Sequence, residues 1–269
     1  MTDTPDPTLP EPPALAETVF AALEDKASLA NGPRIILGLL AGVYIGLGGL
    51  FALIALAEAE ALPFGAAQVL AGLVFALGLV LVMVGGAELF TGNTLMIGPV
   101  AAGRIPPGRA AAALAVVYVA NFAGSVLLAL LVLAAGLHEA GEGAVGRAAL
   151  DLGATKTDKG FGTLLASGIL ANMLVCLAVW LAYGGKTVTQ KLAAVTLPIA
   201  AFVAAGFEHS VANMFLLPYA ALVQAATGAG AAITASAMAT NLIAATIGNL
   251  IGGALIALAY GHAYLKDED

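Results

Sequence analysis

Six long apolar segments, almost free of charged residues, restrict the possible folds of this chain more than any other feature of the sequence. They cover roughly residues 35–56, 66–84 with an extension toward 100, 110–137, 161–183, 193–225 and 241–265. A helix needs about 20 apolar residues to cross the ~30 Å hydrocarbon core of a bilayer. The sequence therefore predicts an all-α polytopic membrane protein with six transmembrane helices, surrounded by lipid.

The composition supports this class and argues against others. Only 10% of the residues are charged, compared with about 25% in soluble domains. The net charge of −7 comes mostly from acidic residues at the termini and in loops and says little about nucleic acid, and no nucleic-acid partner is expected. Cys176 is the single cysteine and lies within an apolar segment. We therefore predict neither a metal site nor a cofactor.

An amphipathic pattern precedes the first apolar segment. Leu15, Val19, Leu23 and Ala27 recur at four-residue intervals, and most of the neighbouring charged residues lie off this stripe. The pattern predicts a short helix over residues 14–30. Such a helix either lies on the membrane surface or docks against the body of the protein.

The basic residues predict the orientation of the chain. With six spans, seven of them fall on one side of the membrane and only three on the other. Because basic residues favour the cytoplasmic side, both termini are predicted to be cytoplasmic. The seven are Lys26, Arg34, Arg104, Arg109, Lys186, Lys191 and Lys266, and the three are Arg147, Lys156 and Lys159.

Matching polar motifs interrupt the second and fifth segments. Both follow the pattern Gly-x-Glu-x-x-x-x-Asn, and the third and sixth segments share the pattern Asn-x-x-Gly. Three spans in each half give the halves opposite orientations in the membrane, which is an inverted repeat. The equivalent residues are Gly86 and Gly206, Glu88 and Glu208, Asn93 and Asn213, Asn121 and Asn249, and Gly124 and Gly252.

Two parts of the chain follow from these patterns. Residues 1–33 are predicted to be a cytoplasmic N-terminal segment, and residues 34–269 a single membrane domain. Within the membrane domain the repeated halves cover about residues 34–137 and 161–265.

The interrupted segments indicate a transport pathway. Non-helical backbone at membrane depth leaves polar groups unpaired, which is tolerated where protein or a water-filled cavity surrounds them. Breaks at matching positions of inverted repeats mark such pathways, and the N-termini of half-helices favour anions. Glu88 and Glu208 are interpreted either as acceptors for N–H groups freed at the breaks or as groups of the pathway. His209 is interpreted as a group that the permeating anion meets.

Four stretches resemble the formate/nitrite transporter family. Residues 201–215, with Gly206-Phe207-Glu208-His209-Ser210, are similar to the signature of its fifth helix. Residues 88–93 resemble the loop of its broken second helix, and residues 171–180 and 247–253 resemble its fourth and sixth helices.

The resemblance implies a homopentamer in the bacterial inner membrane, with an aquaporin-like protomer that contains its own pore and an N-terminal helix linked to pH gating. It implies that His209 faces Thr91 at the centre of the pore, with Asn172, Glu208 and Asn249 nearby and Lys156 attracting anions from the loop before the fourth span. It also implies two apolar constrictions, a cytoplasmic one of Leu79, Leu89 and Phe90 and a periplasmic one of Phe75, Val175 and Phe202.

The expected function is transport of a small monovalent anion, with formate first and nitrite or hydrosulfide as alternatives. The loop Thr91-Gly92-Asn93-Thr94 resembles nitrite-type members, whereas residues 214–218 resemble formate-type members. His209 either transfers a proton to the anion or stays neutral and donates a hydrogen bond.

Two other classes of function are weighed against anion transport. An aquaporin-like channel for neutral solutes is the alternative of a different class, although no Asn-Pro-Ala pair occurs. An enzyme is not expected, because Ser210 beside His209 on a helix would point about 100° away from it.

Overall fold

The computed structural model describes residues 9–265, and all regular secondary structure within that range is helical. Lys266, which contributed to the predicted orientation, and residues 1–8 of the N-terminal segment lie outside the described residues. The helices are α1 Pro12–Ser28, α2 Asn31–Leu56, η1 Ala59–Ala61, α3 Phe64–Gly85, α4 Phe90–Asn93, η2 Thr94–Met96, α5 Ile97–Ala101, α6 Pro107–Ala134, η3 Leu137–Glu139, α7 Ala144–Asp158, α8 Phe161–Gly184, α9 Val188–Ala204, α10 Ser210–Thr227 and α11 Ala235–Tyr264.

The predicted six spans and the two interruptions are confirmed. Among the described residues, six helices are long and apolar enough to cross a membrane, namely α2, α3, α6, α8, α10 and α11. The second segment continues beyond α3 as the short helices α4, η2 and α5, and the fifth segment is divided into α9 and α10. Large apolar side chains such as Val119, Leu131 and Leu197 are exposed on the outer surface. Such a surface suits contact with lipid or with another subunit.

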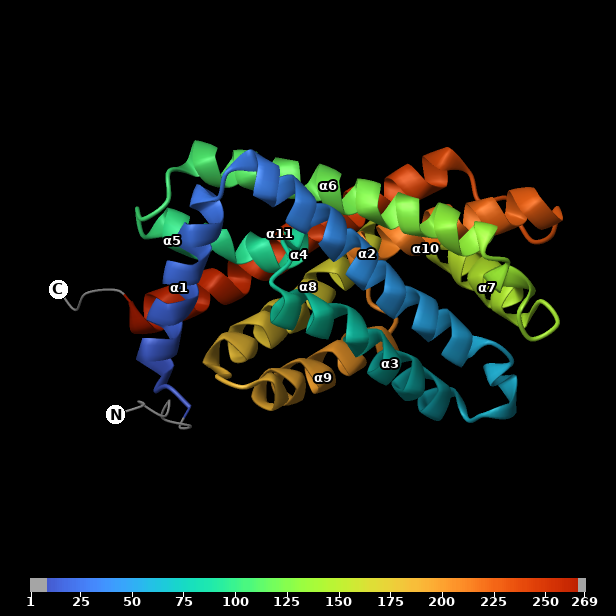
Figure 1. Cartoon of the computed structure of the whole chain (residues 1–269), viewed down its shortest axis with the longest axis horizontal. Coiled ribbons are helices and arrows are strands. Elements are labelled where there is room, and N and C mark those ends of the chain that lie inside the picture. Colours follow the sequence, from blue (N-terminus) through green and yellow to red (C-terminus); the bar gives the residue numbers. More distant parts are fainter. Residues whose placement is uncertain (1–8, 266–269) are drawn as a thin grey trace.

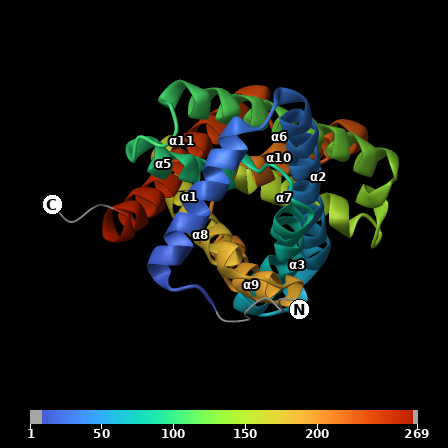
Figure 2. The ribbon, with the colours of Figure 1, turned by 60° about the vertical axis from the view of Figure 1, so that its left-hand side comes forward.

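The amphipathic helix α1 docks against the protein body, which resolves the two alternatives that its sequence left open. Val19, Phe20 and Leu23 are fully buried, and the Phe20 ring meets the edge of Trp180 of α8 with centroids 6.5 Å apart. Figures 1 and 2 show α1 crossing one end of the bundle beside α8 and α11. The predicted apolar stripe therefore packs on protein.

Helix α7 is not predicted by the sequence patterns. It lies at the end of the molecule opposite α1 (Figure 1) and packs against α10. Its inward side is made mostly of small residues, including Ala149 and Gly153, together with Leu150. An apolar stripe of small side chains gives a weak periodic signal, so the sequence places this segment in a loop.

Two equivalent glycines allow the helices of each half to cross closely. A Cβ atom added at Gly124 of α6 would lie 2.1 Å from the carbonyl oxygen of Leu39 in α2. A Cβ atom at Gly252 of α11 would lie 2.3 Å from the carbonyl oxygen of Ile169 in α8. Any side chain would separate these helix pairs. The glycine of the Asn-x-x-Gly pattern thus has the same packing role in both halves.

Candidate functional site at the two helix breaks

Both broken helices stop at a glycine with a left-handed backbone. Gly86 follows α3 with φ +80°, and Gly206 follows α9 with φ +67°. Glycine adopts this conformation without the steric cost that other residues incur. The chain then becomes extended at Leu89 and at His209, which precede α4 and α10. The glycine of the repeated motif is therefore explained by the left-handed backbone conformation that both breaks require.

Two buried asparagines satisfy the backbone groups that the breaks leave unpaired. The Oδ1 atom of Asn121 accepts the backbone N–H of Phe90 at 2.9 Å, and its Nδ2 donates to the carbonyl of Glu88 at 2.9 Å. Asn249 accepts the N–H of Ser210 at 2.8 Å and donates to the carbonyl of Glu208 at 3.0 Å. The predicted repeat is thus reproduced in its hydrogen bonds.

The two carboxylates bind side chains, which contradicts one of the two interpretations made from the sequence, that they accept the backbone N–H groups freed at the breaks. The Oε2 atom of Glu88 accepts from Asn93 at 2.7 Å, and that of Glu208 accepts from Asn213 at 2.6 Å. Each carboxylate also has a lysine partner. A buried charge is costly unless it is paired, whereas the neutral asparagines can complete the backbone bonds.

The lysine partners come from α1 and from the end of α7. Lys26 of α1 lies 2.5 Å from Glu88. Lys156 of α7 lies 3.0 Å from one oxygen of Glu208, and Lys159 lies 2.7 Å from the other. Each half of the repeat is therefore preceded by a short helix that carries a lysine partner for the glutamate of that half.

His209 and Thr91 form the contact between the two halves. The Nε2 atom of His209 and the Oγ1 atom of Thr91 are 2.8 Å apart, and both side chains are buried. The Nδ1 atom of His209 accepts the backbone N–H of Ala212 at 3.1 Å. Because Nδ1 acts as an acceptor, the proton of the neutral ring belongs on Nε2. Nε2–H then donates to Thr91, whose own hydroxyl hydrogen remains available to another acceptor.

The backbone of Thr91 is held by a polar cluster of Asn172, Asn249 and Thr94, and sequence reasoning missed only the role of Thr94. Its carbonyl accepts from the hydroxyl of Thr94 at 2.6 Å and from Asn172 Nδ2 at 3.3 Å. Asn172 also donates to the Thr94 hydroxyl at 2.9 Å and to the carbonyl of Asn249 at 2.5 Å. Asn172 and Asn249 therefore hold the backbone around the central pair. The sequence indicates Thr94 only as a mark of nitrite-type members.

Replacing Thr94 with valine is expected to destabilise the protein by about 1–3 kcal/mol, because the Thr91 carbonyl and Asn172 would each lose a buried partner. Thr94→Ser keeps the hydroxyl and is expected to retain most of the stability. Thermal unfolding in detergent measures both. If Thr94→Val, which keeps the methyl group and lacks the hydroxyl, were as stable as wild type, the hydroxyl would have no stabilising role.

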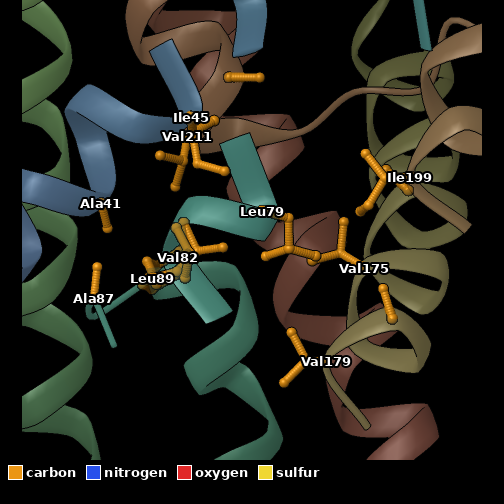
Figure 3. Close-up of a cluster of buried hydrophobic side chains, with 14 of the residues drawn as sticks. Ala41, Ile45, Leu79, Val82, Ala87, Leu89, Val175, Val179, Ile199 and Val211 are labelled. Atoms are coloured by element: carbon orange, nitrogen blue, oxygen red, sulfur yellow. The ribbon is translucent and has the colours of Figure 1, made fainter. Parts of the chain in front are cut away.

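A narrow apolar central cavity lies beside His209 of this pair. Five of the six residues predicted to form constrictions lie along it with His209, and Figure 3 shows Leu79 and Val175 pointing toward each other. Phe75 and Phe202 meet edge to face with centroids 5.5 Å apart. The residues that line it are Ile45, Phe75, Leu79, Leu89, Val175, Ile199, Phe202 and His209.

Phe90, the sixth predicted constriction residue, packs elsewhere. Its ring meets the edge of Tyr118 in α6 with centroids 4.9 Å apart. Its backbone N–H is the group bound by Asn121, so Phe90 starts α4 with its side chain directed at α6. The next residue, Thr91, reaches His209 instead.

A further cavity adjoins the centre on each side. The Glu88-side cavity is lined by Leu23 and Lys26 of α1, together with Leu89 and Asn93. The Glu208-side cavity is lined by Lys156, Phe75, Phe202 and His209. Leu89 and His209 thus separate the central cavity from the two outer ones. Lys156 belongs to α7, which corrects its predicted place in a loop.

From the sequence, Lys26 and Lys159 contribute only to the predicted orientation of the chain. Their pairing with the buried glutamates is not predicted. Lys26 lies near the end of the amphipathic helix, off its apolar stripe. The position of Lys26 on the polar side of this helix was the only feature of the sequence that could have indicated its pairing. Nothing in the sequence near Lys159 distinguishes it from a solvated loop lysine.

Two inverted halves that each contribute a broken helix to a shared centre define a membrane channel or transporter. A family model described as "Formate/nitrite transporter" matches residues 13–263. The chain belongs to the formate/nitrite transporter family.

Similar proteins cover almost the whole chain. The formate channel FocA of Escherichia coli K12 is 37% identical over 272 residues, covering 96% of this chain and 95% of that protein. The formate channel BtFdhC of Bacillus thuringiensis is 34% identical over 260 residues, covering 96% and 97%. A solved pentameric formate channel with formate bound aligns with a TM-score of 0.82 and 34% identity, covering 88% of this chain and 98% of that one.

Proposed function

We propose that this protein transports small monovalent anions across the cytoplasmic membrane, with formate as the principal substrate. The observation that carries the proposal is the Thr91–His209 pair, two buried hydrogen-bonding side chains at 2.8 Å, of which His209 lines an otherwise apolar cavity. Similar proteins named as formate channels support this choice of substrate. The Thr91-Gly92-Asn93-Thr94 loop keeps nitrite as the second candidate within the same family.

The proposed assembly is a homopentamer in which each protomer has its own pore, and the likeness to a solved formate channel that is itself pentameric supports it. The excess of basic residues on the side of α1 supports a cytoplasmic position for both termini. The Glu88-side cavity would then open to the cytoplasm and the Glu208-side cavity to the periplasm.

In the proposed mechanism a small anion loses its water between apolar side chains and is compensated by two donors. Removing an anion from water is costly unless hydrogen bonds replace the lost hydration. The Thr91 hydroxyl supplies one hydrogen, and the Nε2–H group of His209 supplies the second when the anion replaces Thr91 as its acceptor. Hydrogen bonds to a charged group contribute about 1.5–3 kcal/mol each.

His209 acts in this mechanism as a neutral donor. A protonated ring would carry a hydrogen on Nδ1, facing the N–H of Ala212 that Nδ1 now accepts. Proton transfer through the ring would therefore break the contact that starts α10. A proton that accompanies formate would travel as part of formic acid, which has a lower desolvation cost than the anion.

Flux measurements in proteoliposomes test the proposed function. We expect saturable uptake of formate and slower uptake of nitrite and hydrosulfide, with little osmotic swelling in glycerol. Formate flux should rise as the external pH falls if the proton enters with the substrate. Fast swelling in glycerol without anion flux would instead support the neutral-solute channel.

The docking of α1 is expected to be insensitive to pH between 7.5 and 5. Arg104 binds Glu17 and Glu24 of α1, and its hydrogen bonds lower the pKa of the Glu17 carboxyl below its ordinary value. The ion pair is therefore complete above the ordinary value of about 4.3. It is lost only as the pH falls through the lowered pKa.

Hydrogen exchange of the α1 amides measures this docking. After correction for intrinsic rates, wild-type exchange should agree at pH 7.5 and pH 5, and Arg104→Gln should speed it by about two- to five-fold, the scale of exposed ion pairs. Undocking of the wild-type helix at pH 5 would show that other groups control α1.

A further inference from the structure

The two buried glutamates differ in the number of cations they bind. Among the residues that the structure describes, Glu88 has one lysine in contact, Lys26 at 2.5 Å. Glu208 has two, with Lys156 on Oε2 at 3.0 Å and Lys159 on Oε1 at 2.7 Å. The ion cluster at the second break therefore has one positive charge more than negative, whereas the Glu88–Lys26 pair is balanced.

Lys159 is built into this cluster by more than one contact. Its ammonium group also donates to the carbonyl of Gly206, the left-handed glycine of the break, at 3.2 Å. The lysine follows directly after α7 ends at Asp158, so that Lys156 and Lys159 reach Glu208 from the same element. The side chain of Lys159 is 26% exposed, whereas that of Glu208 is completely buried.

Lys156 is the cation that an anion on this side would meet. It lines the Glu208-side cavity together with His209, Phe75 and Phe202. If Glu208 bound only Lys156, the pair would be neutral and would attract an anion weakly. With Lys159 on the other oxygen, the carboxylate is compensated and the charge of Lys156 remains uncancelled at the cavity.

We infer that Lys159 is a further residue of the anion pathway, which keeps the Glu208-side cavity positively charged by neutralising Glu208. This inference rests on the proposed anion transport. It identifies the positive charge that concentrates the anion at one entrance of the pore. A cavity with a net charge and apolar walls raises the local concentration of the opposite ion. Lys159 acts through Glu208 and Lys156 and need not touch the anion.

The test compares formate flux in proteoliposomes for wild type, Lys159→Gln and Lys159→Arg. At formate concentrations well below saturation and at low salt, Lys159→Gln should reduce the flux roughly 3- to 10-fold, because one unit charge is lost near the entrance. Lys159→Arg keeps the charge and should stay within about two-fold of wild type. At saturating formate on the Glu208 side, the deficit of Lys159→Gln should shrink.

Ionic strength separates a charge effect from a folding effect. Raising the salt with an impermeant anion from about 0.01 M to 0.3 M shortens the screening length from about 30 Å to well under 10 Å. Wild-type flux should then fall toward that of Lys159→Gln. Arg147→Gln is the matched control, since Arg147 is a more exposed cation at the same end of the molecule and binds the carbonyl of Glu142. Its flux should stay within about two-fold of wild type.

Three results would overturn the inference. The first is a low-salt formate flux in Lys159→Gln equal to that of wild type. The second is a loss of flux in Lys159→Arg as large as that in Lys159→Gln. The third is a wild-type flux that does not change with salt concentration. The wild-type salt series needs no variant, so a misfolded variant does not block the test. Absence of formate flux in the wild type would instead refute the proposed function itself.

Discussion

Replacement of His209 with phenylalanine is expected to lower formate flux roughly 10- to 100-fold, because one hydrogen bond to a charged group contributes about 1.5–3 kcal/mol and about 1.4 kcal/mol corresponds to a factor of ten in rate. Phenylalanine keeps a flat ring beside Phe202 but has no N–H for the anion and no acceptor for Ala212. Initial uptake of labelled formate into proteoliposomes at pH 5.5 and 7.5 measures the loss.

The matched control is His262→Phe. His262 lies near the end of α11 and is exposed, outside the three cavities around the breaks. This variant should transport formate at the wild-type rate. If His209→Phe kept both the wild-type flux and its pH response, His209 would have no central role.

The largest loss of stability is expected from Glu208→Leu, at about 3–5 kcal/mol, because removal of one partner leaves buried charges uncompensated. Lys156 and Lys159 would lose their carboxylate, and Asn213 would lose one of its two acceptors. Glu88→Leu is expected to cost less, since Glu88 has one lysine partner and the side chain of Lys26 is 23% exposed and can reach water.

Thermal unfolding of the detergent-solubilised protein compares the two leucine variants directly. Glu208→Gln should lie between wild type and Glu208→Leu, because its amide oxygen still accepts hydrogen bonds but carries no charge. Equal stability losses for Glu88→Leu and Glu208→Leu would contradict the assignment of two lysines to Glu208 alone.

The spans and the paired breaks could be predicted because each has a strong physical requirement. A bilayer demands long uncharged helices, and a charged group within one needs a partner or a cavity. Gly86 and Gly206 adopt the same left-handed backbone conformation in the two halves. Asn121 and Asn249 make the same hydrogen bonds to the backbone. Each motif is weak alone, and its repetition in both halves made the two breaks predictable.

The supporting contacts could not be predicted because they join residues distant in sequence. Lys26 and Glu88 are 62 positions apart, and Lys159 and Glu208 are 49 apart. No motif in the local sequence marks these residues as partners, and the only local signal is the place of Lys26 off the apolar stripe of its helix. The direction of Phe90 toward Tyr118 likewise depends on how α4 sits against α6. The contact of Thr91 with His209 was expected only from the family resemblance.

The central claim is that the permeating anion meets a neutral His209 whose proton lies on Nε2, and nitrogen NMR tests it most directly. The chain has three histidines, so protein labelled with ¹⁵N-histidine gives few ring signals, and those of His209 are identified by their loss in His209→Phe. We expect the Nε2–H form from pH 5.5 to 7.5 and a shift of the Nε2 signal when formate is added. A doubly protonated ring within this range, or no response to formate in a protein that transports it, would contradict the account.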